Sequence, residues 1–108
     1  MKVLRIQPLS FPEVIEIKDN LKSLQEEVGG YIEAIYPWED EVALICNEEG
    51  KINGELLNRA LYDEEGRMYD IIAGTFLIVG LTEDNFGSLS DELINKYKTM
   101  FKRPEIWV

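Results

Sequence analysis

The residues best suited to chemistry lie between positions 47 and 61, directly after an apolar stretch. This segment holds three Asn, two Gly, one Lys and one Arg. Asn amides can recognise planar polar edges, and an Arg guanidinium can bind a carboxylate or a phosphate through two hydrogen bonds. If the Gly turns expose backbone donors, the segment and the acid that follows it would line a small polar pocket, built from Asn47, Glu48, Lys51, Asn58, Arg59 and Asp70.

The same residues are also typical of turns. The stretch from Asn47 to Gly50 fits a type I turn with Gly at its last position, and Asn53-Gly54 is a strong turn dipeptide. Each Asn can cap a turn through its own side chain. We favour the turn interpretation because it explains most of these residues, and the binding pocket stays as the alternative.

Two runs of consecutive carboxylates, at 39–41 and 63–65, raise the question of a metal site or an acid–base site. Three consecutive residues in a turn do not converge on one point, and neither run has the spacing of a calcium loop. We therefore interpret both as solvated turns. Trp38 and Trp107 either cover the core or are exposed anchors, and we favour packing at the rim of the core. As the alternative, Trp is frequent at interface hot spots, so an acidic rim around Trp38 would suit a partner with a basic surface. The residues of this predicted surface are Trp38, Glu39, Asp40, Glu41, Asp63, Glu64 and Glu65.

The composition of the 108-residue chain excludes much catalysis. The chain has no His and a single Cys, Cys46, so it lacks a His base, a Ser-His-Asp triad and the ligands of a structural zinc site. We predict no enzymatic activity, no cofactor and no bound metal. The formal net charge is −10, and segment 26–70 alone holds thirteen acidic against three basic residues. This balance argues against direct nucleic-acid binding, which depends on Lys and Arg.

The length and the apolar fraction of 45% predict one domain spanning residues 1–108. A lone Cys cannot form an internal disulfide, and the N-terminus does not have the pattern of a secretory signal. No apolar run approaches the length of a membrane span. We therefore expect a cytoplasmic protein that does not bind membranes, and the oligomeric state stays open.

The hydrophobic pattern predicts both strands and helices. A first short helix should begin after Asp19 or Asn20 and end at Gly29-Gly30. A second helix should have Ser88 as its cap and end at Arg103-Pro104. Alternating and β-branched runs predict strands at 3–6, 13–18, 31–36, 41–46 and 75–80.

Two further segments are less regular. Residues 69–74 should lead directly into the last strand, and residues 56–61 should form a short irregular element. Together the elements predict an α+β fold: an antiparallel sheet of about five strands with two helices packed on one face.

Several blocks of the chain, considered together, resemble a known family. The blocks are Asn-Glu-Glu-Gly-Lys at 47–51, Asn-Arg at 58–59 and Asp-Ile-Ile-Ala-Gly at 70–74, and the likeness is clearest over residues 13–80. They resemble an uncharacterised small-domain family of bacteria, phages and mobile elements known as domain of unknown function 3846. The most recognisable family residues fall here on Gly30, Asn47, Glu48, Gly50, Lys51, Asn58, Arg59, Asp70 and Gly74.

One segment departs from the family pattern. The chain has Glu55-Leu56-Leu57 where the family resemblance leads us to expect a Gly-Leu-Pro-like stretch before the Asn-Arg pair. The resemblance implies a mobile-element context. It brings no established activity, catalytic residue or cofactor.

Two hypotheses for the function follow. In the first, the protein is a non-enzymatic inhibitor of phage or mobile-element type. It would bind a host protein, such as a defence nuclease or restriction enzyme, by presenting its acidic middle where DNA would lie. In the second, it is a small-molecule module that sequesters a nucleotide, with Lys51 and Arg59 on the phosphate and the Asn amides on base or ribose.

The charged residues Arg59 and Asp70 are each followed by an apolar pair. The core should draw in those neighbours and partly desolvate both charged groups. Because a buried charge without a partner is costly, we predict that Arg59 pairs with Asp70 or Glu48 and braces the 47–61 loop.

Overall fold

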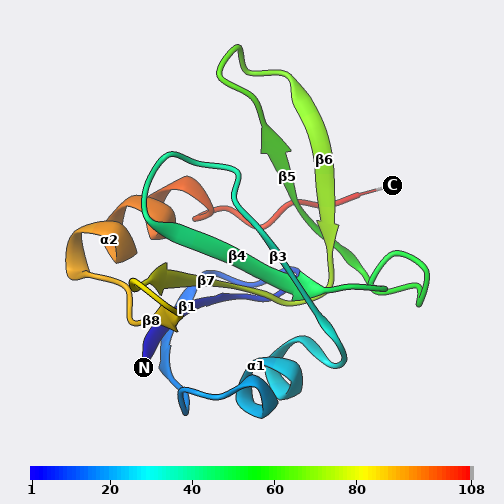
Figure 1. Ribbon diagram of the computed structural model, residues 1–108. Coiled ribbons are helices and arrows are strands. Elements are labelled where there is room, and N and C mark those ends of the chain that lie inside the picture. The colour runs from blue at the N-terminus through cyan, green and yellow to red at the C-terminus, as the bar shows by residue number, and fades with distance from the viewer. Residues whose placement is uncertain (108) are drawn as a thin grey trace.

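An antiparallel sheet forms the centre of the molecule in a computed structural model, which describes residues 1–107 (Figure 1). Within this range neither helix is long and apolar enough to cross a membrane. The elements are β1 (Lys2–Ile6), β2 (Glu13–Glu16), α1 (Leu21–Val28), β3 (Ile32–Ile35), β4 (Val42–Asn47), β5 (Leu57–Tyr62), β6 (Met68–Ala73), β7 (Phe76–Leu81), β8 (Phe86–Gly87) and α2 (Asp91–Met100).

The main sheet has the strand order β2-β1-β7-β4-β3, and the short β8 pairs with β7. Every pair is antiparallel, including the β3–β4 hairpin predicted from the sequence. The central strands β4 and β7 are buried along nearly their whole length. Their unbroken apolar runs follow from this position, because a central strand covered on both faces has no solvent side.

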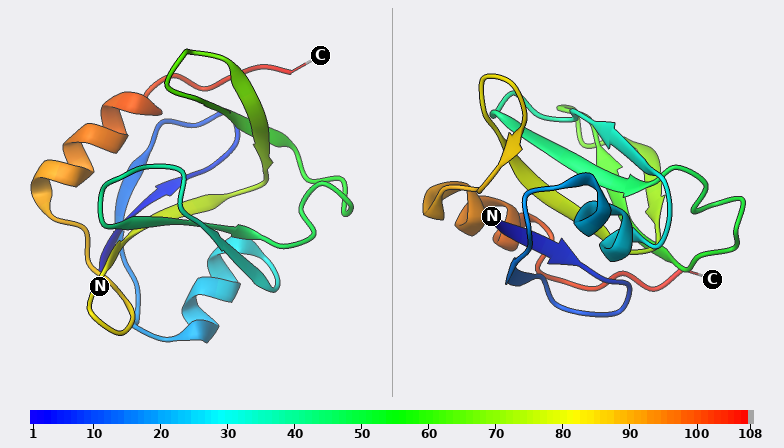
Figure 2. Two further views of the ribbon diagram at one scale, coloured as in Figure 1. Left: turned by 45° about the horizontal axis from the view of Figure 1, so that its top comes forward. Right: turned by 60° about the horizontal axis from the view of Figure 1, so that its bottom comes forward.

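The two helices lie on opposite faces of the main sheet, which corrects the prediction of helices on one face. Alternate residues of β4 divide between two cores: Leu44 packs in the core that includes Tyr97 of α2, whereas Ile45 packs in the core that includes Leu24 of α1. Side chains alternate along a strand, so two apolar faces need two covers. The left view of Figure 2 shows strands of the sheet between the two helices.

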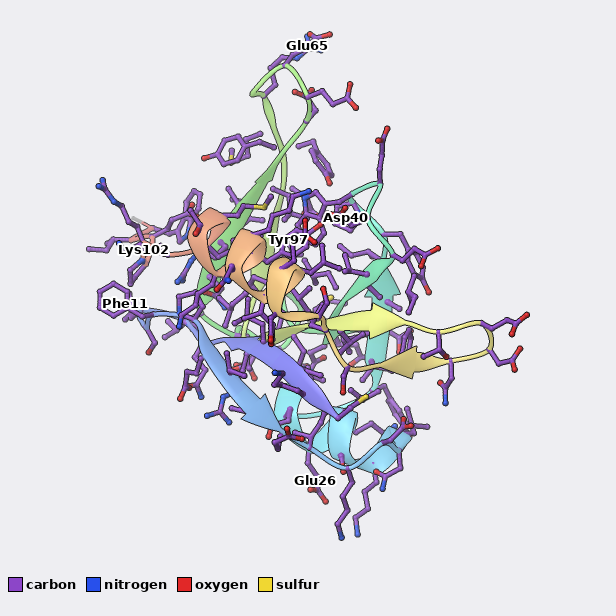
Figure 3. The ribbon with its side chains drawn as sticks, turned by 90° about the vertical axis from the view of Figure 1, so that its left-hand side faces the viewer. Phe11, Glu26, Asp40, Glu65, Tyr97 and Lys102 are labelled. Carbon is purple, nitrogen blue, oxygen red and sulfur yellow. The ribbon has the colours of Figure 1, made fainter. Side chains whose placement is uncertain are left out.

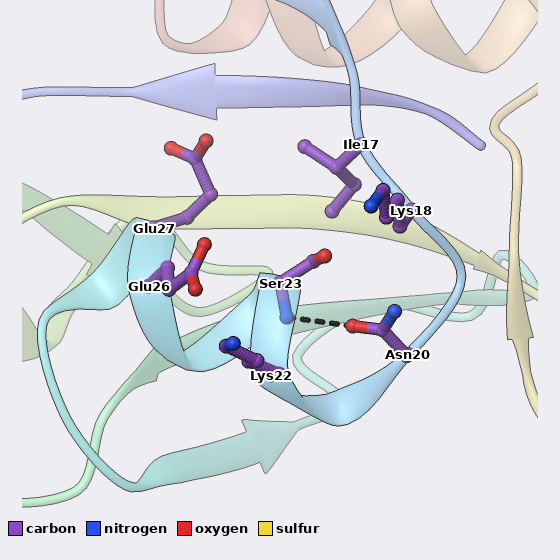
Figure 4. Close-up of a pocket in the computed structure, with 7 residues that line it drawn as sticks. All are labelled: Ile17, Lys18, Asn20, Lys22, Ser23, Glu26 and Glu27. Atoms are coloured by element: carbon purple, nitrogen blue, oxygen red, sulfur yellow. Dashed lines mark hydrogen bonds between the residues drawn. The ribbon is translucent and has the colours of Figure 1, made fainter.

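The ends of both helices follow from local capping. The side chain of Asn20 accepts a hydrogen bond from the Ser23 backbone N–H at 2.8 Å, as the sequence predicts (Figure 4), and Gly29 ends α1 in the left-handed conformation. Ser90 caps α2, which corrects the prediction of Ser88. The Ser88 hydroxyl instead accepts the Lys2 backbone N–H at 2.8 Å, so it is engaged with β1.

A second, two-stranded sheet of β5 and β6 covers the same face of the main sheet as α2, and its hairpin projects from the molecule (Figure 1). Residues 56–61, expected to be irregular, thus lie mostly in a strand. The stretch 69–80 is two strands, because the chain turns at Gly74 with a φ of +79°. The predicted α+β class with an antiparallel sheet is confirmed, with a main sheet of six strands.

The close packing between β7 and β8 can be tested by a substitution at Gly80. A Cβ at this position would lie 2.2 Å from the Ser88 carbonyl oxygen, which belongs to the backbone and cannot swing away. We expect Gly80→Ala to lower the free energy of unfolding by about 3 kcal/mol or more in urea titration. The control Gly66→Ala meets open space and should cost only about 1 kcal/mol, through its positive φ. Equal costs for the two variants would contradict this account.

Candidate functional site

Asn58 and Arg59, which lie in β5 of the projecting hairpin, form a fully buried polar network. The Arg59 guanidinium donates to the Phe101 carbonyl at 3.0 Å and 3.2 Å, to the Ser10 carbonyl at 2.6 Å and to Asn58 Oδ1 at 2.8 Å. The Asn58 amide in turn donates to the carbonyls of Ile6 and Gly74. Both side chains thus hold the fold together, and they do not line the pocket formed by the other predicted ligand-binding residues.

The predicted pairing of Arg59 with Asp70 or Glu48 is wrong. The register of the hairpin places Ile72 opposite Arg59 and Leu61 opposite Asp70. Asp70 binds Lys51 at 2.6 Å instead. One of the acceptors of Arg59, the Phe101 carbonyl, lies at the C-terminal end of α2, where carbonyl oxygens lack intrahelical partners and the helix dipole favours a cation. Burial nonetheless lowers the pKa of the Arg59 guanidinium.

Four of the six predicted ligand-binding residues line one shallow pocket of about 240 Å³: Asn47, Glu48, Lys51 and Asp70. The Asn47 side chain is mostly used by the fold, because it donates to the Val28 carbonyl and accepts the Glu49 N–H in a turn. Further carboxylates at Glu33 and Glu49 line the same pocket. A phosphate would therefore meet several acids and one lysine that is already paired.

The larger concave feature is a groove of about 680 Å³ between the β5–β6 hairpin, the β3–β4 loop and α2. We call it the acidic groove. Its rim includes the carboxylates Glu39, Asp63 and Glu64. Apolar and aromatic side chains make up much of its lining, namely Pro37, Trp38, Ala60, Leu61, Tyr62, Tyr69, Met100 and Phe101.

The acidic residues predicted to contact a partner have different roles. Asp40 accepts hydrogen bonds from Lys96 and from the Tyr97 hydroxyl, both at 2.6 Å, and these bonds lower the pKa of its carboxyl (Figure 3). Asp63 holds the hairpin turn by accepting two backbone N–H groups, and Glu65 pairs with Arg67 at the tip. The structure brings Trp38, Glu39, Asp63 and Glu64 together on the groove, whereas Asp40, Glu41 and Glu65 do not line it.

Trp38 packs inward. Its ring lies 4.6 Å from that of Tyr97 and 5.9 Å from that of Phe101, so it supports the groove from beneath. The exposed apolar groups of the groove are Tyr62, Tyr69 and Met100, with 56%, 55% and 47% of their surface accessible. Sequence reasoning missed all three. The only available signal was that both Tyr residues flank the acidic turn at 63–67.

The C-terminal tail runs beside β5 and lines one end of the groove. The Glu105 carboxylate accepts the Ala60 backbone N–H at 3.2 Å, and the Trp107 indole N–H donates to the Asn58 carbonyl at 3.3 Å. These contacts give hydrogen-bond partners to a backbone N–H and a backbone carbonyl of β5, which would otherwise be unpaired at the edge of the small sheet.

Other chemistry-bearing groups do not converge. A pocket of about 270 Å³ beside α1 mixes Lys18 and Lys22 with Glu26 and Glu27 (Figure 4). The Cys46 thiol is buried, and burial, with a smaller contribution from Glu33, raises its pKa to about 12. Among residues 1–107, no three acidic or thiol side chains are placed to hold a metal ion.

Comparison with known proteins identifies the family. The model of the family described as "Domain of unknown function (DUF3846)" matches residues 1–102. The chain belongs to this family. No curated protein and no solved structure matches the chain. The DUF3846 match ends at residue 102, so Glu105, which lines the groove, and Trp107 lie outside the matched region.

The separation of Arg59 from Asp70 can be tested by a double-mutant cycle. Arg59→Lys should cost about 2–3 kcal/mol in urea unfolding, because one ammonium cannot hold three acceptors in the guanidinium geometry. Asp70→Asn should cost less than about 1 kcal/mol, since its partner Lys51 is exposed. The double variant should be additive to within about 0.5 kcal/mol. A coupling energy well above about 0.5 kcal/mol would show that Arg59 and Asp70 interact after all.

The raised pKa of Cys46 predicts an unreactive thiol. At pH 8 the native protein should react with a thiol reagent such as DTNB at least about a hundredfold more slowly than the urea-unfolded chain. The unfolded thiol has a lower pKa, so the thiol's contribution to stability is complete below about pH 8.5 and is lost as the pH rises toward 12. Cys46→Ala should remove this part of the alkaline destabilisation. Fast labelling of the native protein would contradict the assignment.

Proposed function

We propose that this protein is a non-catalytic interaction module that binds a partner protein with a basic surface in the acidic groove. The observation that carries the proposal is the composition of that groove: an apolar, aromatic lining with four carboxylates and a single lysine, Lys96, whose ammonium is already paired with Asp40. Interfaces of this kind use buried aromatic anchors for affinity and surrounding charges for steering. A matching partner would offer Lys or Arg side chains around an apolar group.

The electrostatics of the chain support this choice. The net charge of −10 is concentrated in residues 26–70, which supply the groove's hairpin and its β3–β4 loop. Glu39 and Glu64 are exposed and make no ion pair within residues 1–107. Both carboxylates are therefore available to cations on a partner.

The absence of catalysis is part of the proposal. The chain has no His, and its one thiol has a pKa of about 12, so neither supplies a base or a nucleophile near neutral pH. The nucleotide-binding alternative has less support. Arg59 and Asn58 are committed to the core, and Lys51 in the remaining pocket is already paired with Asp70.

A narrower form of the proposal makes the partner a host defence nuclease or restriction enzyme, and the protein a DNA mimic of phage or mobile-element origin. The segregated negative charge supports this form, because DNA-binding surfaces are basic and select an acidic ligand. It predicts that the partner's DNA and this protein compete for one surface.

The groove can be tested by local charge reversal. Immobilised wild type and Glu39→Lys/Glu64→Lys are exposed to a host extract, and the captured proteins are quantified by mass spectrometry. A basic partner should be retained by wild type and reduced at least about tenfold on the variant, because each local repulsion replaces an attraction. The matched control Glu83→Lys/Asp84→Lys makes the same change of net charge on the exposed β7–β8 loop and should retain the partner.

Two outcomes decide the proposal. Equal capture by the wild type and the groove variant, or equal loss on both charge variants, would overturn the groove as the binding site. The narrower form is tested by titrating duplex DNA against the captured complex. DNA that fails to displace this protein would remove the mimicry and leave the interaction module in place.

A further inference from the structure

A second surface has the opposite charge and presents an apolar group outward. Phe11, in the loop between β1 and β2, has 67% of its surface exposed, and the neighbouring Leu9 has 61%. Lys98 and Lys102 lie beside Phe11 around a hollow of about 450 Å³. We call Phe11, Lys98 and Lys102 together the basic knob. In Figure 3, Phe11 and Lys102 project from the same side of the molecule, well away from Glu65 at the hairpin tip.

The loop that presents the knob is held in place from inside. Leu9 has a φ of +61°, in the left-handed region that favours glycine, so the loop needs outside support. Arg59 supplies that support by donating to the Ser10 carbonyl at 2.6 Å. The exposed apolar side chains on either side of Ser10 are therefore displayed by a braced loop.

The basic knob and the acidic groove are chemically reciprocal. The groove offers an apolar lining inside a carboxylate rim, and the knob offers an aromatic side chain beside two lysines. Within residues 1–107 neither Lys98 nor Lys102 has an ion-pair partner. Both features are present in every molecule, and each has the composition that the other would bind.

The basic knob of a molecule cannot bind the acidic groove of the same molecule. Lys96 and Met100, four positions apart, face the groove, whereas Lys98 lies two positions from each and faces the knob. Residues two apart on a helix point to nearly opposite sides. The knob of one molecule is therefore directed away from its own groove, and only another molecule can receive it.

We propose that a second copy of this chain docks its basic knob into the acidic groove, with Phe11 on the apolar lining and Lys98 and Lys102 facing Glu39 and Glu64. The contact joins two different patches, so it is head-to-tail and can extend into a chain of copies. The net charge of −10 opposes association at long range, but that repulsion is screened beyond the Debye length while the docked charges are in contact. The inference shares the groove with the proposed function but does not require a host partner.

Sedimentation equilibrium of the purified protein tests this docking. At about 150 mM salt, where the Debye length is about 8 Å, the net charge is screened while the docked pairs stay in contact, so the average mass of wild type should rise above 12.5 kDa with concentration. At about 1 M salt, where the Debye length is about 3 Å, the mass should return to that value. Lys98→Gln/Lys102→Gln and Glu39→Gln/Glu64→Gln should each remain monomeric alone. Their equimolar mixture should form a dimer that does not grow, because it contains one intact knob and one intact groove that fit together. Lys18→Gln/Lys22→Gln, with the same change of charge as the knob variant, should behave as wild type.

The outcomes separate this inference from the proposed function. A wild type that stays monomeric at about 150 mM salt, or a knob variant that associates as well as wild type, would overturn the self-docking. If such a monomer still captured a basic partner through Glu39 and Glu64, the proposed function would stand alone. Binding of a polyglutamate peptide by a monomeric wild type, lost in Lys98→Gln/Lys102→Gln, would assign the knob to an acidic partner and also overturn self-docking.

Discussion

The buried guanidinium of Arg59 joins three parts of the molecule that are distant in sequence. It binds the carbonyl that ends α2, a carbonyl in the β1–β2 loop and the amide of its neighbour Asn58. A cation in a dry interior is costly unless its donors are satisfied. The acceptors are two backbone carbonyls and the Asn58 amide oxygen, and the nearby Glu105 carboxylate also favours the charged guanidinium. The positions of these segments therefore depend on one another.

Both surfaces considered for binding are consequences of this arrangement. Because Arg59 fixes the end of α2 against β5, Phe101 and Met100 border the acidic groove on its helical side. Because the same side chain holds Ser10, the loop displays Phe11 beside the lysines of α2. One interior residue thus sets the geometry of two exterior patches of opposite charge.

Most of the polar residues that stand out in the sequence form hydrogen bonds that hold the fold together. Asn47 and Asp63 each satisfy backbone groups in turns, and Asp40 holds α2 through Lys96 and Tyr97. Of these three residues Asn47 is buried, Asp40 is partly exposed and Asp63 is exposed, yet each uses its side-chain oxygens to bind other parts of the fold. Tyr62, Tyr69 and Met100, with Glu39 and Glu64, are the exposed side chains on which the proposed association rests.

The sequence by itself determined the features that depend on local chemistry. Helix caps, turn dipeptides and apolar alternation act within a few residues, so the Asn20 cap, the Gly29 stop, the β3–β4 hairpin and the α+β class were predictable. The segregation of charge into residues 26–70 and the family resemblance were also visible there.

Only the tertiary structure decided what depends on long-range packing. The pattern at 69–80 could not show that the chain turns at Gly74 and sends β6 into a separate hairpin, because an apolar run does not specify its pairing partner. Arg59 took carbonyls of Phe101 and Ser10, which lie 42 and 49 residues away, and no local rule identifies such acceptors. For the same reason Tyr62, Tyr69 and Met100 line one groove only because the hairpin and α2 are brought together.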